Sequence, residues 1–275
     1  MLFADAALAA RIDRAEADLC ATLARAATSD AIVRPVGGGL AIYAKPGSAV
    51  NKTIGIGFGE RLDEAVLAEL EEQWRSRNEL VRVELSVLAD AENGTILTRR
   101  GYRLIGFEHE MGRLLDDLGD EPSSEVAGLR IERVPPHDVP LWREIAVTGF
   151  LHLDGTGTGS EDSFSREALE QMMSDFVGAP GFDLYLARIE GEPAGVASVR
   201  LHRGLAQLSG ATTLPAFRRR GIQTALLEKR LSLARAAGCE LAVVTTQPGS
   251  KSQSNSQRQG FQLLYARAVL VKSWD

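Results

Sequence analysis

The segment 214–227 combines one glycine with three arginines at the point where a strand is expected to end and a helix to begin. The first amides of a helix have no partner within the helix, and together with the helix dipole they attract anions. Gly221 has no Cβ, so a ligand can approach the backbone closely. Arg218, Arg219 and Arg220 add forked donors that suit a pyrophosphate or a 3′-phosphate. The segment therefore predicts a phosphate-binding turn; the alternative is a solvated basic turn that binds nothing.

Two other kinds of site have less support. A Walker-type nucleotide site is disfavoured, because no Gly-Lys-Ser/Thr follows to reach phosphates and magnesium. Cys20 and Cys239 lie far apart in apolar segments, which predicts buried free thiols rather than a disulfide or a metal pair. The four histidines show no metal-ligand spacing, so no metal is expected; they are His109, His137, His152 and His202.

The bulk composition is that of an ordinary globular protein. The 275 residues are 44% hydrophobic and 25% charged, with a net charge of −6, a pI near 5.4 and a mean hydropathy of −0.08. The acidic balance is unlike that of a general nucleic-acid binder. The N-terminus has no basic segment before an apolar run, and no run approaches the roughly 18 apolar residues that span a membrane. We therefore expect a soluble, cytoplasmic protein without nucleic-acid or membrane partners.

Hydrophobic periodicity divides the first part of the chain into alternating helices and strands. Leu8, Ile12, Leu19 and Leu23 recur near helical spacing and predict one amphipathic helix over residues 5–27. The other predicted elements are a hairpin around 37–39, a half-buried strand with Ile54, Ile56 and Phe58 inward, a helix over 62–77, and strands over 80–85 and 102–115.

The second part of the chain follows an acidic stretch rich in Gly, Pro and Ser, which is typical of a linker. Short turns after residues 189 and 201 favour an antiparallel meander. The apolar strand over 241–244 follows a helix, which suits a central strand. The predicted elements are strands over 129–134, 183–189, 194–201, 205–213, 241–244 and 263–272, with helices over 139–150 and 166–176 and from 222 to Gly238.

The two parts of the chain end in a similar order of elements. One has a strand, a helix, Arg100-Gly101-Tyr102 and a long strand; the other has a strand, a polar segment, Gln259-Gly260-Phe261 and a long strand. This weak internal repeat suggests two tandem copies of one α/β unit. The predicted division is a domain over 1–118, a linker over 119–128 and a second domain over 129–275.

The second domain resembles the GNAT superfamily of N-acetyltransferases. The resemblance rests on their acetyl-CoA signature, R/Q-x-x-G-x-G/A, in which Arg218 matches the first position and Gly221 the central glycine. Gln223 stands where Gly or Ala is commoner, so the match is imperfect there. Pro215 and Phe217 resemble the approach to the signature, and the order of elements from 129 to 272 resembles that fold. The stretch from 255 to 261 resembles the family's late helix and Gly-Phe turn.

The resemblance implies a mixed α/β fold with two tandem GNAT-like domains, each a mostly antiparallel twisted sheet flanked by helices. It implies acetyl-CoA as co-substrate, with a thioester held where the strands that end near Ala211-Thr212 and Val244-Thr245 part. An amine would attack the acetyl group directly, and backbone amides would stabilise the oxyanion. The residues it implies for acetyl-CoA are Thr213, Leu214, Arg218, Arg219, Arg220, Gly221, Ile222, Gln223, Thr224 and Asn255.

The implied catalytic residues depart from the family pattern. Many members place a tyrosine acid four residues before the late glycine, and here that position is Ser256. No glutamate base is evident on the fourth strand, where Gln207 is the polar residue, so the base is unassigned. His152, Asp154 and Glu161 fall where the family shapes its acceptor site, and the alternative for them is a solvated polar loop.

The first domain resembles the same fold more faintly. Its turn before the helix at 62–77 carries Glu60, Asp63 and Glu64, which favour a helix N-terminus but would repel a pyrophosphate. Residues 1–118 are therefore expected to form a degenerate companion domain that is structural or shapes the substrate site.

The function expected from these observations is acetyl transfer from acetyl-CoA to an amine on a small molecule or a peptide. The alternatives are a non-catalytic acyl-CoA-binding sensor or interaction module, which the serine and the missing base motivate, and a nucleotide-phosphate binder. A homodimer is also compatible with the sequence, since helix 5–27 suits either a core or an interface.

Overall fold

The computed structural model describes residues 2–116, 118, 126–152, 165–178 and 180–274. The chain divides into two compact units. The N-terminal unit comprises Met1–Met111, Thr245–Pro248 and Leu263–Asp275, and the C-terminal unit comprises Gly112–Val244 and Gly249–Gln262. Most of the predicted linker, 119–128, lies outside the described residues.

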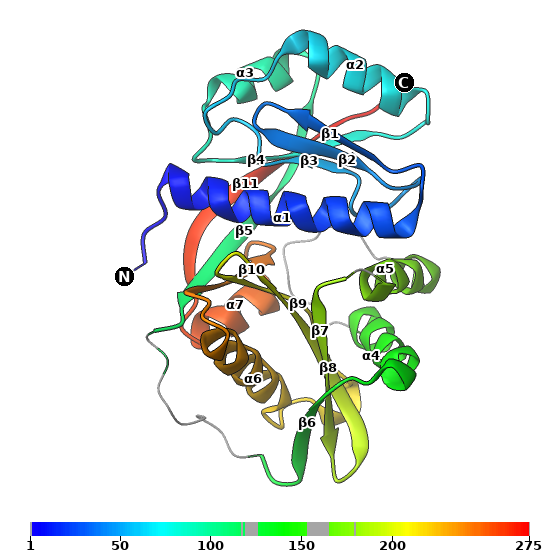
Figure 1. Ribbon diagram of the computed structural model, residues 1–275, viewed down its shortest axis with the longest axis vertical. Helices are drawn as coiled ribbons and strands as arrows, with labels where there is room; N and C mark the ends of the chain where they lie inside the picture. The colour runs from blue at the N-terminus through cyan, green and yellow to red at the C-terminus, as the bar shows by residue number, and fades with distance from the viewer. Residues whose placement is uncertain (1, 117, 119–125, 153–164, 179, 275) are drawn as a thin grey trace. The chain divides into compact units, whose positions relative to one another are not determined.

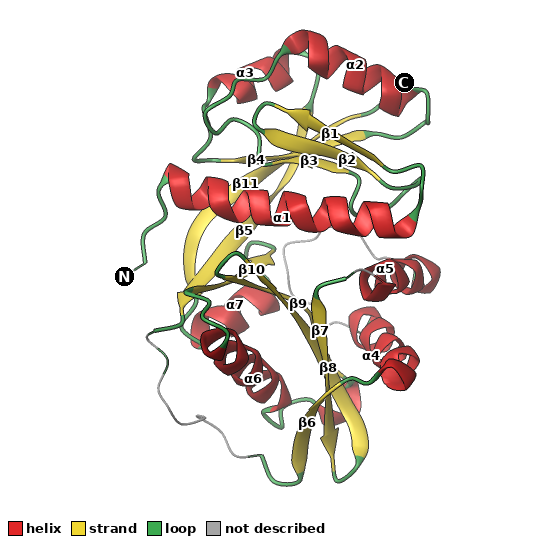
Figure 2. Cartoon of the chain, in the orientation of Figure 1, coloured by secondary structure: helices red, strands yellow, loops and turns green. Residues whose placement is uncertain are grey.

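The N-terminal unit is a sheet with helices on both faces (Figures 1 and 2). Its strands follow the order β1-β2-β3-β4-β11-β5. Apolar side chains of α1 pack with Ile42 and Ile54 on one face, and α2 and α3 pack with Val81 and Val83 on the other. The elements are α1 (Ala6–Ala27), β1 (Ile32–Val36), β2 (Gly39–Tyr43), β3 (Lys52–Ile54), α2 (Glu64–Arg75), β4 (Val81–Ser86), α3 (Glu92–Arg99), β5 (Arg103–Leu114) and β11 (Gln262–Lys272).

The last strand of the chain, β11, belongs largely to the N-terminal unit. It pairs antiparallel with β4, with Arg267 opposite Ser86 and Lys272 opposite Val81. The predicted second domain, 129–275, counted this strand as its own, because patterns along the chain report periodicity and not pairing partners. Because β11 is hydrogen-bonded to β4, most of it belongs to the N-terminal unit instead.

The predicted strand through Ile54, Ile56 and Phe58 is wrong beyond its first residue. β3 ends at Ile54, and the chain then turns. Gly55, Gly57 and Gly59 have φ of 75°, 81° and 82°, in the left-handed region that a strand does not use. The apolar alternation therefore came from glycine-rich turns, in which Ile56 is still buried in the core and Phe58 is half-buried.

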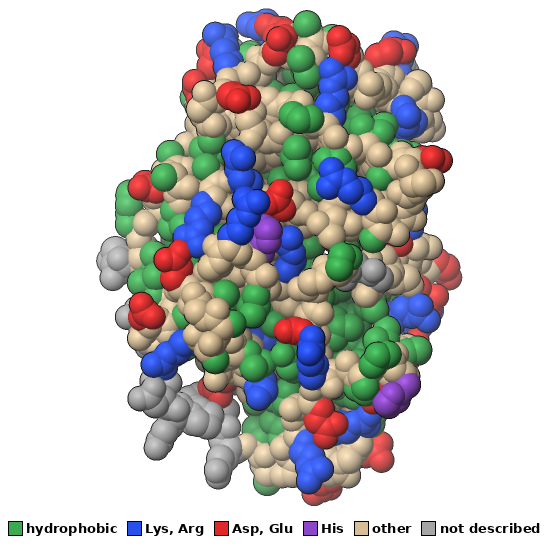
Figure 3. Space-filling view, viewed as in Figure 1, with side chains coloured by type: hydrophobic (Ala, Val, Ile, Leu, Met, Phe, Trp, Pro, Cys, Tyr) green, Lys and Arg blue, Asp and Glu red, His purple; other side chains and the backbone are tan. Residues whose placement is uncertain are grey.

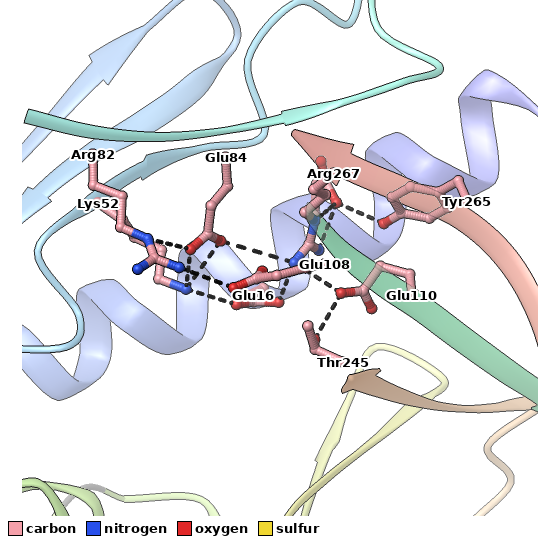
Figure 4. A network of polar contacts seen from close by, with 10 residues as sticks. Glu16, Lys52, Arg82, Glu84, Glu108, Glu110, Thr245, Tyr265 and Arg267 are labelled. Carbon is pink, nitrogen blue, oxygen red and sulfur yellow. Dashed lines mark hydrogen bonds and ion pairs between the residues drawn. The ribbon is translucent and has the colours of Figure 1, made fainter. Parts of the chain in front are cut away.

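A network of charged side chains is buried inside the N-terminal unit, as Figure 4 shows. Arg267 is fully buried and donates to Asp13 at 2.6 Å, to Glu16 at 2.8 Å and to Glu110 at 2.9 Å. Lys52 donates to Glu16 and Glu84, each at 3.0 Å. The network comprises Asp13, Glu16, Lys52, Arg82, Glu84, Glu108, Glu110, Thr245, Tyr265 and Arg267. These contacts join α1, β3, β4, β5 and β11, so buried charges hold the helix to the sheet.

The C-terminal unit contains the other five strands of the 11-stranded sheet, with helices on both faces of them. Its strands follow the order β10-β9-β8-β7-β6. In Figure 1, α4 and α5 lie on one face of β7 and β8, and α6 lies on the other. The elements are β6 (Leu129–Arg133), α4 (Val139–Leu151), α5 (Arg166–Gly178), β7 (Phe182–Ile189), β8 (Glu192–His202), β9 (Leu205–Thr213), α6 (Ile222–Ala236), β10 (Leu241–Thr246) and α7 (Lys251–Arg258).

Strands β6 to β9 form the predicted antiparallel meander, and β10 pairs parallel with β9. The fully buried Trp142 of α4 anchors the core between the helices and the sheet, and its Nε1 donates to the Ala197 carbonyl at 3.3 Å. The prediction of a mixed α/β fold with a mostly antiparallel sheet flanked by helices is confirmed.

The two cysteines are placed as the sequence predicts. Cys20 and Cys239 are both buried, and neither forms a disulfide. Basic and acidic side chains are interspersed on the face seen in Figure 3. Within the described ranges, no helix combines the length and the apolar character needed to cross a bilayer.

Candidate functional site

The candidate site begins at the exposed turn between β9 and α6. The chain leaves β9, makes one short helical turn at Pro215–Phe217, and enters α6 at Ile222. Arg219 and Gly221 both have φ in the left-handed region, 61° and 79°, which turns successive amides toward one side. A Cβ at Gly221 would lie 3.1 Å from Val126 Cγ2, so the glycine also relieves crowding.

Within the described part of the chain, no side chain caps the N-terminus of α6. The N-cap is Gly221, and no side-chain cap hydrogen bond reaches the first amides of this helix from the described residues. Ile222 is buried while Gly221 and Gln223 are exposed, so the turn opens to solvent. The uncapped amides, the helix dipole and the arginines together suit an anion.

The corresponding helix of the N-terminal unit is capped by the protein's own residues. Asp63 accepts from the amide of Ala65 at 2.8 Å and from that of Val66 at 3.5 Å. Asn93 Oδ1 accepts from the amide of Leu62 at 2.9 Å. A carboxylate therefore already occupies the place that an anion would take at α2.

Strands β9 and β10 part from each other beside this turn. Their parallel pairing runs from Leu205 opposite Leu241 to Gln207 opposite Val243 and then stops. Farther along β9, the register with β8 shifts between Ser198 and Val196, and Gly210 has φ of 59°. This bulge bends β9 away over its last residues. The parting begins three to four residues earlier on β9 than the predicted Ala211-Thr212.

Arg218 is turned toward protein carbonyl groups. Its Nε donates to the Thr213 carbonyl at 3.2 Å, and an Nη donates to the His152 carbonyl. Arg220 stacks on Phe217, with 5.4 Å from its guanidinium carbon to the ring centre. Arg219 and Arg220 are exposed, whereas Arg218 is half-buried.

Helix α7 packs its polar residues against the start of α6. Asn255 Nδ2 donates to Gln223 Oε1 at 3.3 Å, and Gln259 Nε2 lies 3.4 Å from Thr224 Oγ1. The structure thus brings the predicted residues Asn255, Gln223 and Thr224 together. Ser256 is buried in this helix, and its carbonyl accepts from the amide of Phe261 at 3.0 Å.

The predicted acceptor residues are only partly described. His152 directly follows α4, and its Nδ1 lies 2.9 Å from the Thr148 carbonyl. Asp154 and Glu161 lie outside the described residues. Among the residues that are described, no group of three or more His, Cys, Asp or Glu could hold a metal ion.

Two buried arginines near the parted strands were not predicted. Arg200 Nη1 donates to Gln207 Oε1 at 2.6 Å, so the polar residue of β9 is held by a cation. Arg230 of α6 donates to the carbonyls of Leu226, Ser198 and Ser209 at 3.1, 3.0 and 3.4 Å. Burial lowers the pKa of Arg230 to about 10. The sequence could have predicted the burial of Arg230, because it lies four residues after the buried Leu226 and residues four apart share one face of a helix.

A groove of about 350 Å³ lies between α4 and α5. It contains none of the predicted site residues. The lining residues are Arg143, Glu144, Val147, Glu167, Glu170, Gln171 and Ser174.

Comparison with solved structures shows the same fold in other proteins. A GCN5-related N-acetyltransferase from Kribbella flavida is similar over 98% of this chain and 96% of its own, with a TM-score of 0.68 and 18% identity. A tandem GNAT protein from the clavulanic acid biosynthesis pathway is similar over 76% of this chain and 69% of its own, with a TM-score of 0.57 and 15% identity. A GCN5-related N-acetyltransferase from Sphaerobacter thermophilus covers 76% and 67%, with a TM-score of 0.56 and 16% identity.

Comparison by sequence locates the family in the second half of the chain. No curated relative matches the sequence significantly. Residues 150–261 match the model of the acetyltransferase (GNAT) family, a range that runs from the end of α4 to the turn before β11 and includes Arg218, Gly221 and Asn255. Residues 150–261 of this chain are therefore a domain of the acetyltransferase (GNAT) family.

Proposed function

We propose that this protein is an acetyl-CoA-dependent N-acetyltransferase whose C-terminal unit transfers acetyl to an amine. The observation that carries the proposal is the uncapped N-terminus of α6, which lies behind an exposed glycine-arginine turn beside the parted strands β9 and β10. An anion at the turn and an extended arm along the end of β9 suit a long ligand that bears a pyrophosphate.

The residues of the turn would bind the phosphates of acetyl-CoA. The amides from Arg219 to Thr224 would donate to the pyrophosphate, and Arg219 and Arg220 would add positive charge. Gly221 gives the closest approach, because any side chain there would also meet Val126. Asn255 holds Gln223 from the side, which fixes the first turn of α6 before a ligand arrives.

The transfer requires a bond exchange at the thioester carbonyl carbon. The neutral amine attacks this carbon, a C–N bond forms, the C–S bond breaks, and CoA leaves as a thiolate. The nitrogen releases a proton, and the thiolate or the solvent takes one up. Backbone amides beyond the point where β9 and β10 part would stabilise the oxyanion. Thr213 and Leu214 would pair with the pantetheine arm.

Ser256 is the candidate proton donor to the thiolate. It is buried in α7, the helix whose Asn255 and Gln259 contact the start of α6. A serine hydroxyl is a weak acid, so the contribution of Ser256 is expected to be small. The acceptor amine, on a small molecule or a peptide, would enter past His152 at the end of α4.

Thermal stability with and without acetyl-CoA tests the proposal. Ligand at about a hundredfold over its dissociation constant should add roughly 2.7 kcal/mol to the stability of the native state. Gly221→Glu should remove this shift, because it places a side chain and a negative charge where the pyrophosphate would lie.

Gly59→Glu is the matched control. Gly59 also has a left-handed backbone, with φ of 82°, and no atom lies within 4 Å of a Cβ built there. It lies in the turn before α2, so the same substitution carries a comparable backbone penalty and should leave the acetyl-CoA shift intact. If neither the wild type nor the control responds to acetyl-CoA, the proposed binding site is wrong.

Release of free CoA separates an enzyme from a sensor. The protein is incubated with acetyl-CoA and a panel of amino acids, polyamines, aminoglycosides and short peptides, and the thiol is quantified. Turnover with any amine, lost in Gly221→Glu, supports acetyl transfer. Tight acetyl-CoA binding without turnover would favour the non-catalytic acyl-CoA sensor.

A further inference from the structure

Arg218 occupies the first position of the signature, yet its side chain contacts protein carbonyl groups on two different elements. Its Nε donates to Thr213, the last residue of β9. An Nη donates to the carbonyl of His152, the residue that ends α4. One guanidinium therefore joins the turn before α6, the end of β9 and the end of α4, and all three lie in the C-terminal unit.

The carbonyl of His152 is a suitable partner for a cation. The last carbonyls of a helix have no partner within the helix, and they carry the negative end of the helix dipole. Hydrogen bonds that involve a charged group are stronger than neutral ones. The contact therefore stabilises the end of α4 and fixes its direction.

The end of α4 is also packed tightly against the parted end of β9. A Cβ on Gly149 would lie 2.2 Å from Thr212 Oγ1 and 2.8 Å from Thr212 Cβ, so the helix backbone lies directly on this strand. Leu151 and Leu214 pack against one apolar cluster with Trp142. Arg218 closes this corner on its solvent side, since Arg218 is half-buried and His152 is exposed.

We propose that Arg218 is a positioning residue that fastens the end of α4 to the end of β9 and so shapes the acceptor side of the proposed acetyl-transfer site. Arg219 and Arg220, which are exposed on the same turn, supply the positive charge for the phosphates instead. The role in the acceptor side rests on the proposed acetyl transfer; the fastening of α4 does not. Loss of Arg218 should therefore loosen α4 and weaken use of the amine more than binding of acetyl-CoA.

Hydrogen exchange without ligand tests the fastening directly. In Arg218→Ala, the amides at the end of α4, residues 149–152, should exchange about tenfold faster than in the wild type, since a charge-assisted contact is lost. Arg218→Lys keeps the charge but not the fork, so it should restore part of the protection. Arg219→Ala, one position along the same turn, should exchange like the wild type.

Two ligand measurements test the division of roles. Calorimetry with acetyl-CoA should give a dissociation constant that rises about tenfold in Arg219→Ala and less than threefold in Arg218→Ala. With the amine from the panel that turns over fastest, Arg218→Ala should raise KM for the amine severalfold and leave KM for acetyl-CoA nearly unchanged. Arg218→Lys should recover part of that loss.

The opposite pattern would overturn the proposal. If Arg218→Ala weakens acetyl-CoA binding as much as Arg219→Ala does, and the end of α4 exchanges as in the wild type, Arg218 is a phosphate ligand. If the wild type binds no acetyl-CoA, the proposed function fails, while the exchange experiment still decides whether Arg218 fastens α4.

Discussion

Replacing Glu110 by glutamine is expected to change how the stability of the N-terminal unit depends on pH. Glu110 is 1% exposed, and its Oε1 accepts from Thr245 Oγ1 at 2.7 Å and lies 2.9 Å from Arg267 Nη1. Burial raises the pKa of this carboxyl to about 8, against the partly compensating attraction of Arg267. Glu16 and Asp13 oppose its ionisation as well.

The sign of the effect follows from where the proton is bound. The unfolded chain releases the Glu110 proton near pH 4.5, whereas the folded chain keeps it until about pH 8. Between these values the native state binds more protons, so its stability falls as the pH rises. The slope for one proton is about 1.4 kcal/mol per pH unit, which amounts to several kcal/mol across the window. The contribution is fully present below pH 4.5 and lost above about pH 8.

Glutamine keeps the acceptor oxygen for Thr245 and Arg267 but cannot ionise. Glu110→Gln should therefore lose stability less steeply as the pH rises; a smaller downward slope remains, because burial also raises the pKa of Glu108 to about 6 and that of Asp13. The variant should gain stability relative to the wild type as the pH rises from 5 to 8. Urea unfolding at several pH values, monitored by tryptophan fluorescence, measures this difference in stability. Trp74 and Trp274 lie in the N-terminal unit and Trp142 in the C-terminal unit, so a two-step curve can be resolved.

Glu60→Gln is the control, because it removes one exposed carboxyl from the same unit and so accounts for the change in net charge. Glu16 does not contribute to the pH dependence between pH 4.5 and 8. Burial opposes its ionisation, but the attraction of Arg267 and Lys52 outweighs that cost and lowers its pKa, so its contribution is lost only as the pH falls below 4.5. Equal slopes for the wild type and Glu110→Gln would refute the argument, since they would mean that Glu110 is ionised in the native state at neutral pH.

Four further substitutions test the packing and the charges directly. In thermal unfolding, Gly149→Ala should destabilise the C-terminal unit by about 1–3 kcal/mol, because its Cβ would overlap Thr212. Gly94→Ala is the matched control, since its Cβ would meet only Leu85, at 3.6 Å. It should stabilise α3 by up to about 1 kcal/mol in the same measurement. Asp63→Ala should cost about 1 kcal/mol, measured by urea unfolding, because it removes the cap of α2. Arg267→Ala should cost about 3–5 kcal/mol, because several carboxylates would stay buried without their cation; a loss below 1 kcal/mol would show that water replaces it.

Local patterns were enough to predict most elements and the position of the turn between β9 and α6. The turn depends on a short segment in which a strand end, a glycine and a helix start follow one another, so its physics is contained in neighbouring residues. The same reasoning failed at Ile56 and Phe58, where alternation imitated a strand. Positive φ at Gly55 and Gly57 decides that case, and only the glycines hint at it in the sequence.

The buried charges could not be predicted in this way. In β5, Glu108 and Glu110 alternate with Phe107 and His109, a pattern that normally marks a solvated face. Their burial depends on β11 and on the acidic face of α1, which are distant in the sequence. Periodicity assigns residues to a face of a strand but says nothing of which element covers that face.

The same limit applies to Arg218. Its type and spacing match a signature, which identifies the turn but not the atom that the guanidinium reaches. An arginine side chain is long enough to reach either a bound phosphate or the end of α4, and the tertiary placement of His152 decides between them. Gly149 has no side chain, so the backbone of α4 packs directly on Thr212. This packing sets the position of the His152 carbonyl. The signature arginine is thus bound to the ends of β9 and α4 in this structure, which is the observation on which its proposed positioning role rests.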